Sequence, residues 1–170
     1  MMSQFPAFFH GSVRDNFLIA KADATDAEIQ LVCEQTGLWS LLRRVMSEHP
    51  LQHPFAAGMY LSGGQQRLFA LTRCLLRDPS ILFLDEPTTN MSNDEKILLI
   101  PIIRKACRDK TVVVVDHDIA WLTQLCDHFV VLDSGKVVQE GTSHDLASTD
   151  GIFRQLFVSV PRSQSSQFTP

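Results

Sequence analysis

The chain has 170 residues, of which 45% are apolar, and it carries a formal net charge of −4 at pH 7. This length suits one compact domain, and the apolar content is enough to form a core. The negative charge argues against a general polyanion binder such as a non-specific DNA-binding protein, so we expect no nucleic-acid partner. The four cysteines are far apart in the sequence, which predicts reduced thiols and neither a disulfide framework nor a zinc site.

The first 78 residues have mainly helical patterns. Ser12 is a candidate N-cap for a short first helix. Helical spacing continues over residues 23–45, with Gly37 as a stop signal, and a second long helix is predicted over residues 62–77. Two prolines predict a loop over residues 50–54.

Three apolar segments in the second half of the chain predict strands, in the order SILFLDEP, TVVVVDHD and HFVVLDSGKVVQ. Prolines bound the first segment, which fits a strand that is fully buried. The third segment contains Ser134–Gly135 and predicts a hairpin with its turn at these two residues.

Helical patterns at about 93–107 and 119–126 lie between these strands. Strands that alternate with helices predict an α/β fold with a mainly parallel sheet. Pro101 lies inside the first of these helices, and we expect it to kink or split the helix. The last residues, 159–170, are polar and rich in serine and glutamine, which predicts disorder.

Asp85 and Glu86 follow the first predicted strand, at the end where open α/β sheets bind their ligands. A carboxylate at this place can hold Mg²⁺, which prefers oxygen ligands, and a second carboxylate can polarise an attacking water. The alternative is an ordinary acidic turn in which Asp85 caps nearby amides. His117 follows the next strand and could contact a phosphoryl group, although a single histidine there is also compatible with a structural role.

The segment LSGGQ places Ser62, Gly63 and Gly64 at the start of the second long helix. Glycines let a phosphate approach the backbone, and the helix dipole favours an anion at this end. The alternative is a serine N-cap, which explains Ser62 but leaves two glycines at a position where they cost stability. The pair of glycines therefore favours a phosphate-binding role.

Together these segments resemble the nucleotide-binding domain of ATP-binding cassette (ABC) transporters of the exporter type. The resemblance covers about residues 3–157 and rests on five motifs in order. They are a Q-loop (SQFPAFFHGSVRDN, 3–16), a signature motif (LSGGQQR, 61–67), a Walker B strand with its glutamate (ILFLDEP, 81–87), a D-loop (TTNMS, 88–92) and a switch histidine (VVVVDHD, 112–118).

The resemblance implies ATP hydrolysis coupled to the export of a substrate, with ATP and Mg²⁺ bound. By position in these motifs, Gln4 would sense Mg²⁺ and relay to the membrane domain, and Asp85 would hold Mg²⁺. Glu86 would polarise the attacking water, and His117 would contact the γ-phosphate. It is the resemblance to the family that implies these roles.

The family also implies the partners. Two cassettes face each other head to tail, and each signature motif covers the nucleotide that the other cassette holds. Ser62, Gly63, Gly64 and Gln65 would then bind the nucleotide of a second nucleotide-binding domain. A transmembrane domain of a transporter would be the other partner, which places this chain at the cytoplasmic face of a membrane.

The sequence departs from the family in several places. The phosphate loop G-x-x-x-x-G-K-[ST] is absent from all 170 residues, so we expect an incomplete cassette that is inactive alone. Ser92 stands where the D-loop commonly ends in Asp. We also expect an unpaired sheet edge and an uncovered apolar face, which invite partner binding or aggregation.

The expected fold is therefore a partial P-loop NTPase-type core with a mainly parallel sheet, plus a helical subdomain. We expect a Q-loop remnant at 1–10, a helical subdomain at 11–78, the C-terminal part of the catalytic core at 79–158 and a disordered tail at 159–170. Two other classes are open. One is a non-catalytic, cassette-derived module that regulates or binds a partner cassette and donates its signature motif. The other is a DNA-repair ATPase of the same superfamily, which the absence of coiled-coil heptads disfavours.

Overall fold

The computed structural model describes residues 1–46, 49–56 and 60–158. The chain divides into a first compact unit, Met1–Asp116, and a second unit that begins at His117. The tail over 159–170, for which the sequence predicts disorder, lies outside the described residues. The predicted division into a Q-loop remnant, a helical subdomain and a catalytic part stays a prediction.

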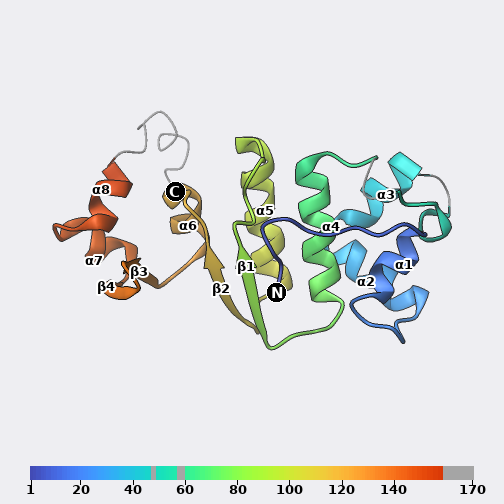
Figure 1. The fold of residues 1–170 in the computed structure, drawn as a ribbon, viewed down its shortest axis with the longest axis horizontal. Helices are drawn as coiled ribbons and strands as arrows, with labels where there is room; N and C mark the ends of the chain where they lie inside the picture. Colours follow the sequence, from blue (N-terminus) through green and yellow to red (C-terminus); the bar gives the residue numbers. More distant parts are fainter. Residues whose placement is uncertain (47–48, 57–59, 159–170) are drawn as a thin grey trace. The chain divides into compact units, whose positions relative to one another are not determined.

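The first unit contains five α-helices, a short 3₁₀ helix and two strands among its described residues (Figure 1). In chain order these are α1 (Val13–Leu18), α2 (Asp26–Thr36), α3 (Leu38–Met46), η1 (Pro50–Gln52), α4 (Gly63–Leu75), β1 (Ile81–Asp85), α5 (Asn93–Ala106) and β2 (Thr111–Val115). The predicted helices over 23–45 and 62–77 are confirmed, with a boundary at Gly37, whose φ of +78° ends α2 in the left-handed conformation. The predicted loop over 50–54 includes the turn of η1.

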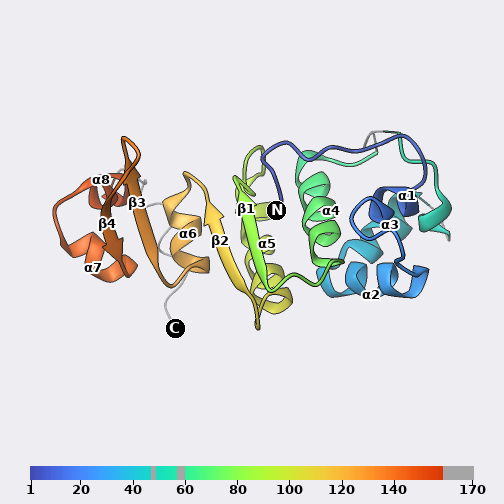
Figure 2. The same cartoon turned by 60° about the horizontal axis from the view of Figure 1, so that its bottom comes forward.

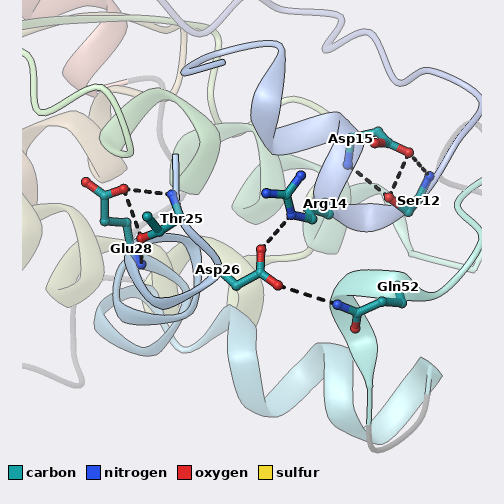
Figure 3. Close-up of polar contacts among 7 residues, drawn as sticks. All are labelled: Ser12, Arg14, Asp15, Thr25, Asp26, Glu28 and Gln52. Atoms are coloured by element: carbon teal, nitrogen blue, oxygen red, sulfur yellow. Dashed lines mark hydrogen bonds and ion pairs between the residues drawn. The ribbon is translucent and has the colours of Figure 1, made fainter. Parts of the chain in front are cut away.

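Four helices of the first unit begin with a capping box. In each box the N-cap hydroxyl accepts from the backbone N–H three residues later, and the side chain of that residue accepts from the N-cap backbone N–H. Figure 3 shows two of them, Ser12 with Asp15 at α1 and Thr25 with Glu28 at α2. Between them, Arg14 Nε donates to Asp26 Oδ1 at 2.5 Å. The predicted cap at Ser12 is confirmed, and caps of this kind fix where each helix starts.

An aromatic cluster forms the centre of the helical part. Phe69 of α4 stacks on Phe17 of α1 with ring centroids 4.6 Å apart, and on Phe55 at 5.1 Å. Phe8 meets Phe55 and Phe69 edge-on at 5.5 and 5.4 Å. Such pairs add to the free energy gained by burying the rings, so this cluster anchors α4 to the N-terminal segment.

The strands β1 and β2 pair in parallel, with Phe83 opposite Val113 and Asp85 opposite Val115. Figure 2 shows the two strands side by side. Leu82 and Leu84 are buried, whereas Ile81 is 55% exposed and Phe83 is 49% exposed. The prediction of a fully buried strand is therefore wrong, because side chains alternate across a strand and only one face of β1 is covered. The expected uncovered apolar face is confirmed here.

The N-terminal segment runs beside β1. Met2 N–H donates to the carbonyl of Phe83 at 2.8 Å, and Asp85 N–H donates to the carbonyl of Met2 at 3.0 Å. These two bonds make an isolated parallel bridge between Met2 and Leu84. As a result, the next residues of the N-terminal segment lie at the carboxyl end of β1.

The helix α5 is continuous, and Pro101 lies inside it. Of the predicted kink or split at this proline, the split is wrong, and the kink stays a prediction. Proline lacks the N–H that would bond to the carbonyl of Ile97, but Ile97 and Pro101 are both exposed, so water can bond to that carbonyl. Burial of Leu99 and Ile103 holds the helix on its other side.

The second unit contains α6 (Ile119–Leu125), β3 (Phe129–Asp133), β4 (Lys136–Gly141), α7 (Ser143–Ser148) and α8 (Ile152–Val158). The strands β3 and β4 form the predicted antiparallel hairpin, which is confirmed. Ser134 and Gly135 both have positive φ, at +49° and +76°, and this twist suits a two-residue hairpin turn. The core of this unit includes Phe129 and Phe153, whose ring centroids lie 5.2 Å apart.

Candidate functional site

The backbone at Glu86 is held in an unusual conformation directly after β1. Its φ is +44°, a left-handed value that costs a non-glycine residue about 1–3 kcal/mol. Glu86 N–H donates to the carbonyl of Val115 at 2.7 Å, and the Glu86 carbonyl accepts from Arg67 Nη1 at 3.1 Å. Hydrogen bonds from β2 and from α4 therefore hold this peptide, and these bonds offset the strain.

The carboxylate of Glu86 is half-buried and accepts two hydrogen bonds at the same oxygen. Gln4 Nε2 donates to Oε2 from the N-terminal segment, and Thr89 Oγ1 donates to Oε2 at 2.8 Å. The structure thus brings together Gln4 and Glu86, which lie 82 positions apart and which the sequence assigned to one site. Thr89 was missed, although its place three residues after Glu86 in a tight loop was a usable signal.

Asp85 is the last residue of β1, and its side chain is half-buried. Its carboxylate and the side-chain oxygen of Gln4, whose amide nitrogen is used by Glu86, are ligands of the kind that Mg²⁺ prefers. The described residues contain no cluster of three or more His, Cys, Asp or Glu side chains that could enclose a metal ion. This set of donors fits an ion that keeps water and phosphate ligands, as Mg²⁺ does.

Asp116 holds the loop after Glu86 and was not predicted as a site residue. Thr88 is 1% exposed, and both its N–H and its Oγ1 donate to Asp116 Oδ2, at 3.2 and 2.7 Å. A charged acceptor makes these bonds stronger than neutral ones. The sequence signal was the position of Asp116, which follows β2 as Glu86 follows β1.

Arg67 is another site residue that sequence reasoning missed. It belongs to α4 and is only 4% exposed, which is rare for an arginine without compensating partners. Burial lowers the pKa of its guanidinium, while the charges of Glu86 and Asp116 act in the opposite direction. Helical spacing could have identified this residue, because Arg67 lies four positions before Leu71 and therefore on a buried face of α4.

The signature segment starts α4 as a capped turn. Ser62 N–H donates to Gln65 Oε1 at 2.9 Å, and Ser62 Oγ accepts from Gln65 N–H at 3.3 Å. Ser62 and Gly63 are exposed, so the first turn of the helix is accessible to solvent. The position of Ser62 is therefore explained by its role as the N-cap of α4, which was the alternative to phosphate binding in the sequence analysis.

Packing gives one of the two glycines a structural reason. A Cβ on Gly64 would lie 2.4 Å from Oε1 of Glu95, so only glycine leaves room for this carboxylate in its present position. A Cβ on Gly63 would lie 3.5 Å from the carbonyl of Asn90, which is an ordinary contact. Packing thus explains Gly64, whereas Gly63 has no such steric requirement.

His117 is exposed and begins the second unit. It follows Asp116 directly, and Asp118 then caps α6 by accepting from Trp121 N–H at 3.0 Å. The predicted role of His117 at the γ-phosphate stays a prediction.

Comparison with known proteins shows the family. The sequence model of the family described as ABC transporter matches residues 1–89. The chain therefore belongs to the ABC transporter family, and its fold is that of an exporter nucleotide-binding domain. A solved structure described as a bacterial Atm1-family ABC exporter with ATP bound superposes with a TM-score of 0.81 at 21% identity, over 92% of this chain and 27% of that one.

Curated relatives have similar names. An uncharacterized ABC transporter ATP-binding protein of Haemophilus influenzae is 29% identical over 161 residues, which are 92% of this chain and 26% of the relative. The ABC-type transporter kk1G of Curvularia clavata is 34% identical over 158 residues, and the ABC transporter B family member 14 of Arabidopsis thaliana is 31% identical over 157 residues. In both cases 92% of this chain aligns with 12% of the relative. This chain thus spans about a quarter or less of the length of these three relatives.

Proposed function

We propose that this chain belongs to an ATP-binding cassette that couples ATP hydrolysis to substrate export through a membrane domain. The observation that supports it best is the carboxylate of Glu86, which Gln4 and Thr89 hold at the carboxyl end of a parallel strand. Open α/β sheets bind their ligands at this end. Because the chain belongs to the ABC transporter family, we interpret this end of β1 as a site for ATP hydrolysis.

In this proposal each of the side chains that the sequence assigned to catalysis has its own role. Glu86 orients and polarises the attacking water, and its anchoring by Thr89 limits the positions that its carboxylate can adopt. Asp85 and the side-chain oxygen of Gln4 provide oxygen ligands to Mg²⁺, which when bound neutralises charge on the phosphates. His117 contributes a hydrogen bond to the γ-phosphate.

The chain alone neither binds ATP tightly nor hydrolyses it. Its 170 residues contain no G-x-x-x-x-G-K-[ST] segment, whose lysine and backbone amides hold the β- and γ-phosphates in this class of enzyme. Purified chain mixed with ATP and Mg²⁺ should release no phosphate above the level of the Glu86→Gln variant. Steady phosphate release that Glu86→Gln abolishes would overturn this part of the proposal.

The signature segment acts on the nucleotide of a partner. Ser62, Gly63, Gly64 and Gln65 form the first turn of α4, where amide donors and the helix dipole favour an anion. A second nucleotide-binding domain, arranged head to tail, would hold that nucleotide in its own phosphate loop. The exposed side chain of Phe5, which follows Gln4, is available for the transmembrane domain.

The test of this role is the ATPase activity of a complete cassette of the exporter type, measured with and without the purified chain. The chain should raise the rate, and Ser62→Arg should abolish the increase because it adds bulk and charge to the signature turn. Ser143→Arg, at the start of α7, is the matched control and should leave the increase intact. Equal rates with the unmodified chain and with Ser62→Arg would show that the signature turn is not used.

The second candidate is a non-catalytic module that regulates or binds a partner cassette. The observation in its favour is Ser92, which caps α5 where the family commonly has Asp in the D-loop. The two differ in their need for Glu86, and they separate in a cassette in which a G-x-x-x-x-G-K-[ST] segment is joined ahead of this chain. Glu86→Gln should abolish ATP hydrolysis by that cassette under the first proposal, whereas a non-catalytic module should release no phosphate with or without Glu86.

For either function we propose that the chain lies at the cytoplasmic face of a membrane, next to the membrane domain of a transporter. No helix in the part of the chain that the structure describes is long and apolar enough to cross a membrane.

A further inference from the structure

Two segments of the first unit, α4 and the end of β2, hold the backbone of the loop from Glu86 to Thr88. Arg67 of α4 donates to the Glu86 carbonyl at 3.1 Å, and Val115 of β2 accepts from the Glu86 N–H at 2.7 Å. Asp116, the next residue after β2, accepts from the N–H and hydroxyl of Thr88. Hydrogen bonds therefore hold the N–H and the carbonyl of Glu86, the left-handed residue, and also the N–H of Thr88 two residues later.

Arg67 and Asp116 act on the same short loop. Arg67 and Thr88 are both almost fully buried, so hydrogen-bonding groups left without partners there would be costly. Asp116 is half-buried, and the charges of Glu86 and Asp116 both favour the charged form of Arg67. Because Arg67 and Asp116 hold residues only two positions apart, a loop that is loosened at one contact retains less of the other. Replacing both side chains should therefore cost less than the two single replacements suggest.

We infer that Arg67 and Asp116 are a coupled pair of positioning residues that hold Glu86 in its left-handed conformation. Arg67 acts on the Glu86 carbonyl, and Asp116 acts through Thr88 two residues later. Arg67 lies in the second turn of α4, so the pair holds the Glu86 loop against the body of that helix. The importance of this positioning for catalysis rests on the proposed function, but the positioning itself does not.

The test is amide hydrogen exchange of Glu86 and Thr88 in the full chain, followed by NMR without nucleotide or partner. Asp116→Ala should speed exchange of the Thr88 amide roughly tenfold, since its acceptor is lost. Asp116→Asn keeps an acceptor oxygen and should restore most of the protection. Asp133→Ala is the matched control, because Asp133 also ends a strand but is exposed, and it should leave both amides unchanged.

The coupling is tested with Arg67→Gln in two backgrounds. In the unmodified chain it should speed exchange of the Glu86 amide about tenfold, and in Asp116→Asn the change should be at least about threefold smaller. Equal effects in both backgrounds would overturn the coupling, and unchanged exchange in Asp116→Ala would overturn the positioning by Asp116. If Asp116→Ala does not fold, Thr88→Val removes the hydroxyl bond to Asp116 and keeps the N–H bond. It should speed exchange of the amide at position 88 by a smaller factor, with the amides of α2 as a measure of intact fold, and unchanged exchange would overturn the positioning by Asp116.

This experiment and the mixing assay can fail independently. Exchange that changes as expected in a chain that never raises the rate of a complete cassette would retain the positioning pair and overturn the proposed function.

Discussion

Two of the segments that carry the family's motifs, the signature turn and the loop after β1, are held by different kinds of contact. The signature turn at 61–65 is fixed by hydrogen bonds between Ser62 and Gln65, which are three residues apart. The Glu86 loop is fixed from three distant places in the chain, by Gln4, by Arg67, and by Val115 with the adjacent Asp116. A locally capped turn can form wherever its helix forms, whereas the Glu86 loop requires the whole first unit.

Only one of the two motifs depends on tertiary structure. The first turn of α4 is accessible at Ser62 and Gly63, and in the proposed function it requires only the nucleotide of a partner cassette. The carboxylate of Glu86 has two donors from its own chain, and in the proposed function it also requires a phosphate loop, which the 170 residues do not contain. Four substitutions separate the local from the long-range contributions.

The largest loss of stability is expected for a substitution in the middle of α4. Phe69→Ala removes a fully buried ring that stacks on Phe17 and Phe55, and it should lower the free energy of unfolding by about 3–5 kcal/mol. Urea unfolding followed by circular dichroism measures this change. Phe5→Ala is the control, since Phe5 is 73% exposed, and it should change the stability little. Equal losses in the two variants would mean that the aromatic cluster does not anchor α4.

The second-largest loss of stability is expected at Thr88, the buried threonine of the Glu86 loop. Thr88→Val keeps the shape but removes the hydroxyl that donates to Asp116, and it should cost about 1–3 kcal/mol of the free energy of unfolding. Thr111→Val is the matched control at an exposed position at the start of β2. A loss at Thr88 no larger than that at Thr111 would contradict a loop held by long-range contacts.

A smaller effect is expected at the signature turn. Ser62→Ala removes the acceptor of the α4 cap and should cost about 0.5–2 kcal/mol, whereas Ser62→Thr should retain most of the stability. Hydrogen exchange of the Glu86 amide should not change in either variant if the cap is local. Faster exchange at Glu86 in Ser62→Ala would show that the two segments are not independent.

The smallest effect is a pH dependence at another local cap, that of α2. The ammonium of Lys21, followed by the N–H and hydroxyl of Thr25, lowers the pKa of Glu28 from 4.5 to about 2. Because the folded-state pKa is the lower one, this stabilisation is complete above pH 4.5 and is lost as the pH falls towards 2. Glu28→Gln should flatten this part of the stability curve in urea titrations at successive pH values. An unchanged curve would assign the acid sensitivity to other carboxylates.

Local patterns in the sequence predicted the elements well where neighbours decide the outcome. The cap at Ser12, the stop at Gly37 and the turn at Ser134–Gly135 are confirmed, because each depends on backbone conformation or hydrogen bonds within a few residues. A kink or a split was predicted at Pro101, and the split was wrong because burial of one face keeps α5 together, whereas propensity contains no information about burial.

Sequence patterns were sufficient to assign the family of this protein, the order of its motifs and the helix cap at Ser12. The folded structure was needed to show that Gln4 contacts Glu86, that Arg67 and Asp116 hold the loop around it, and that one face of β1 remains exposed. The difference lies in the range of the interactions. Caps and turns join residues three or four positions apart, whereas these contacts join residues brought together by the path of the chain, and no local pattern encodes that path.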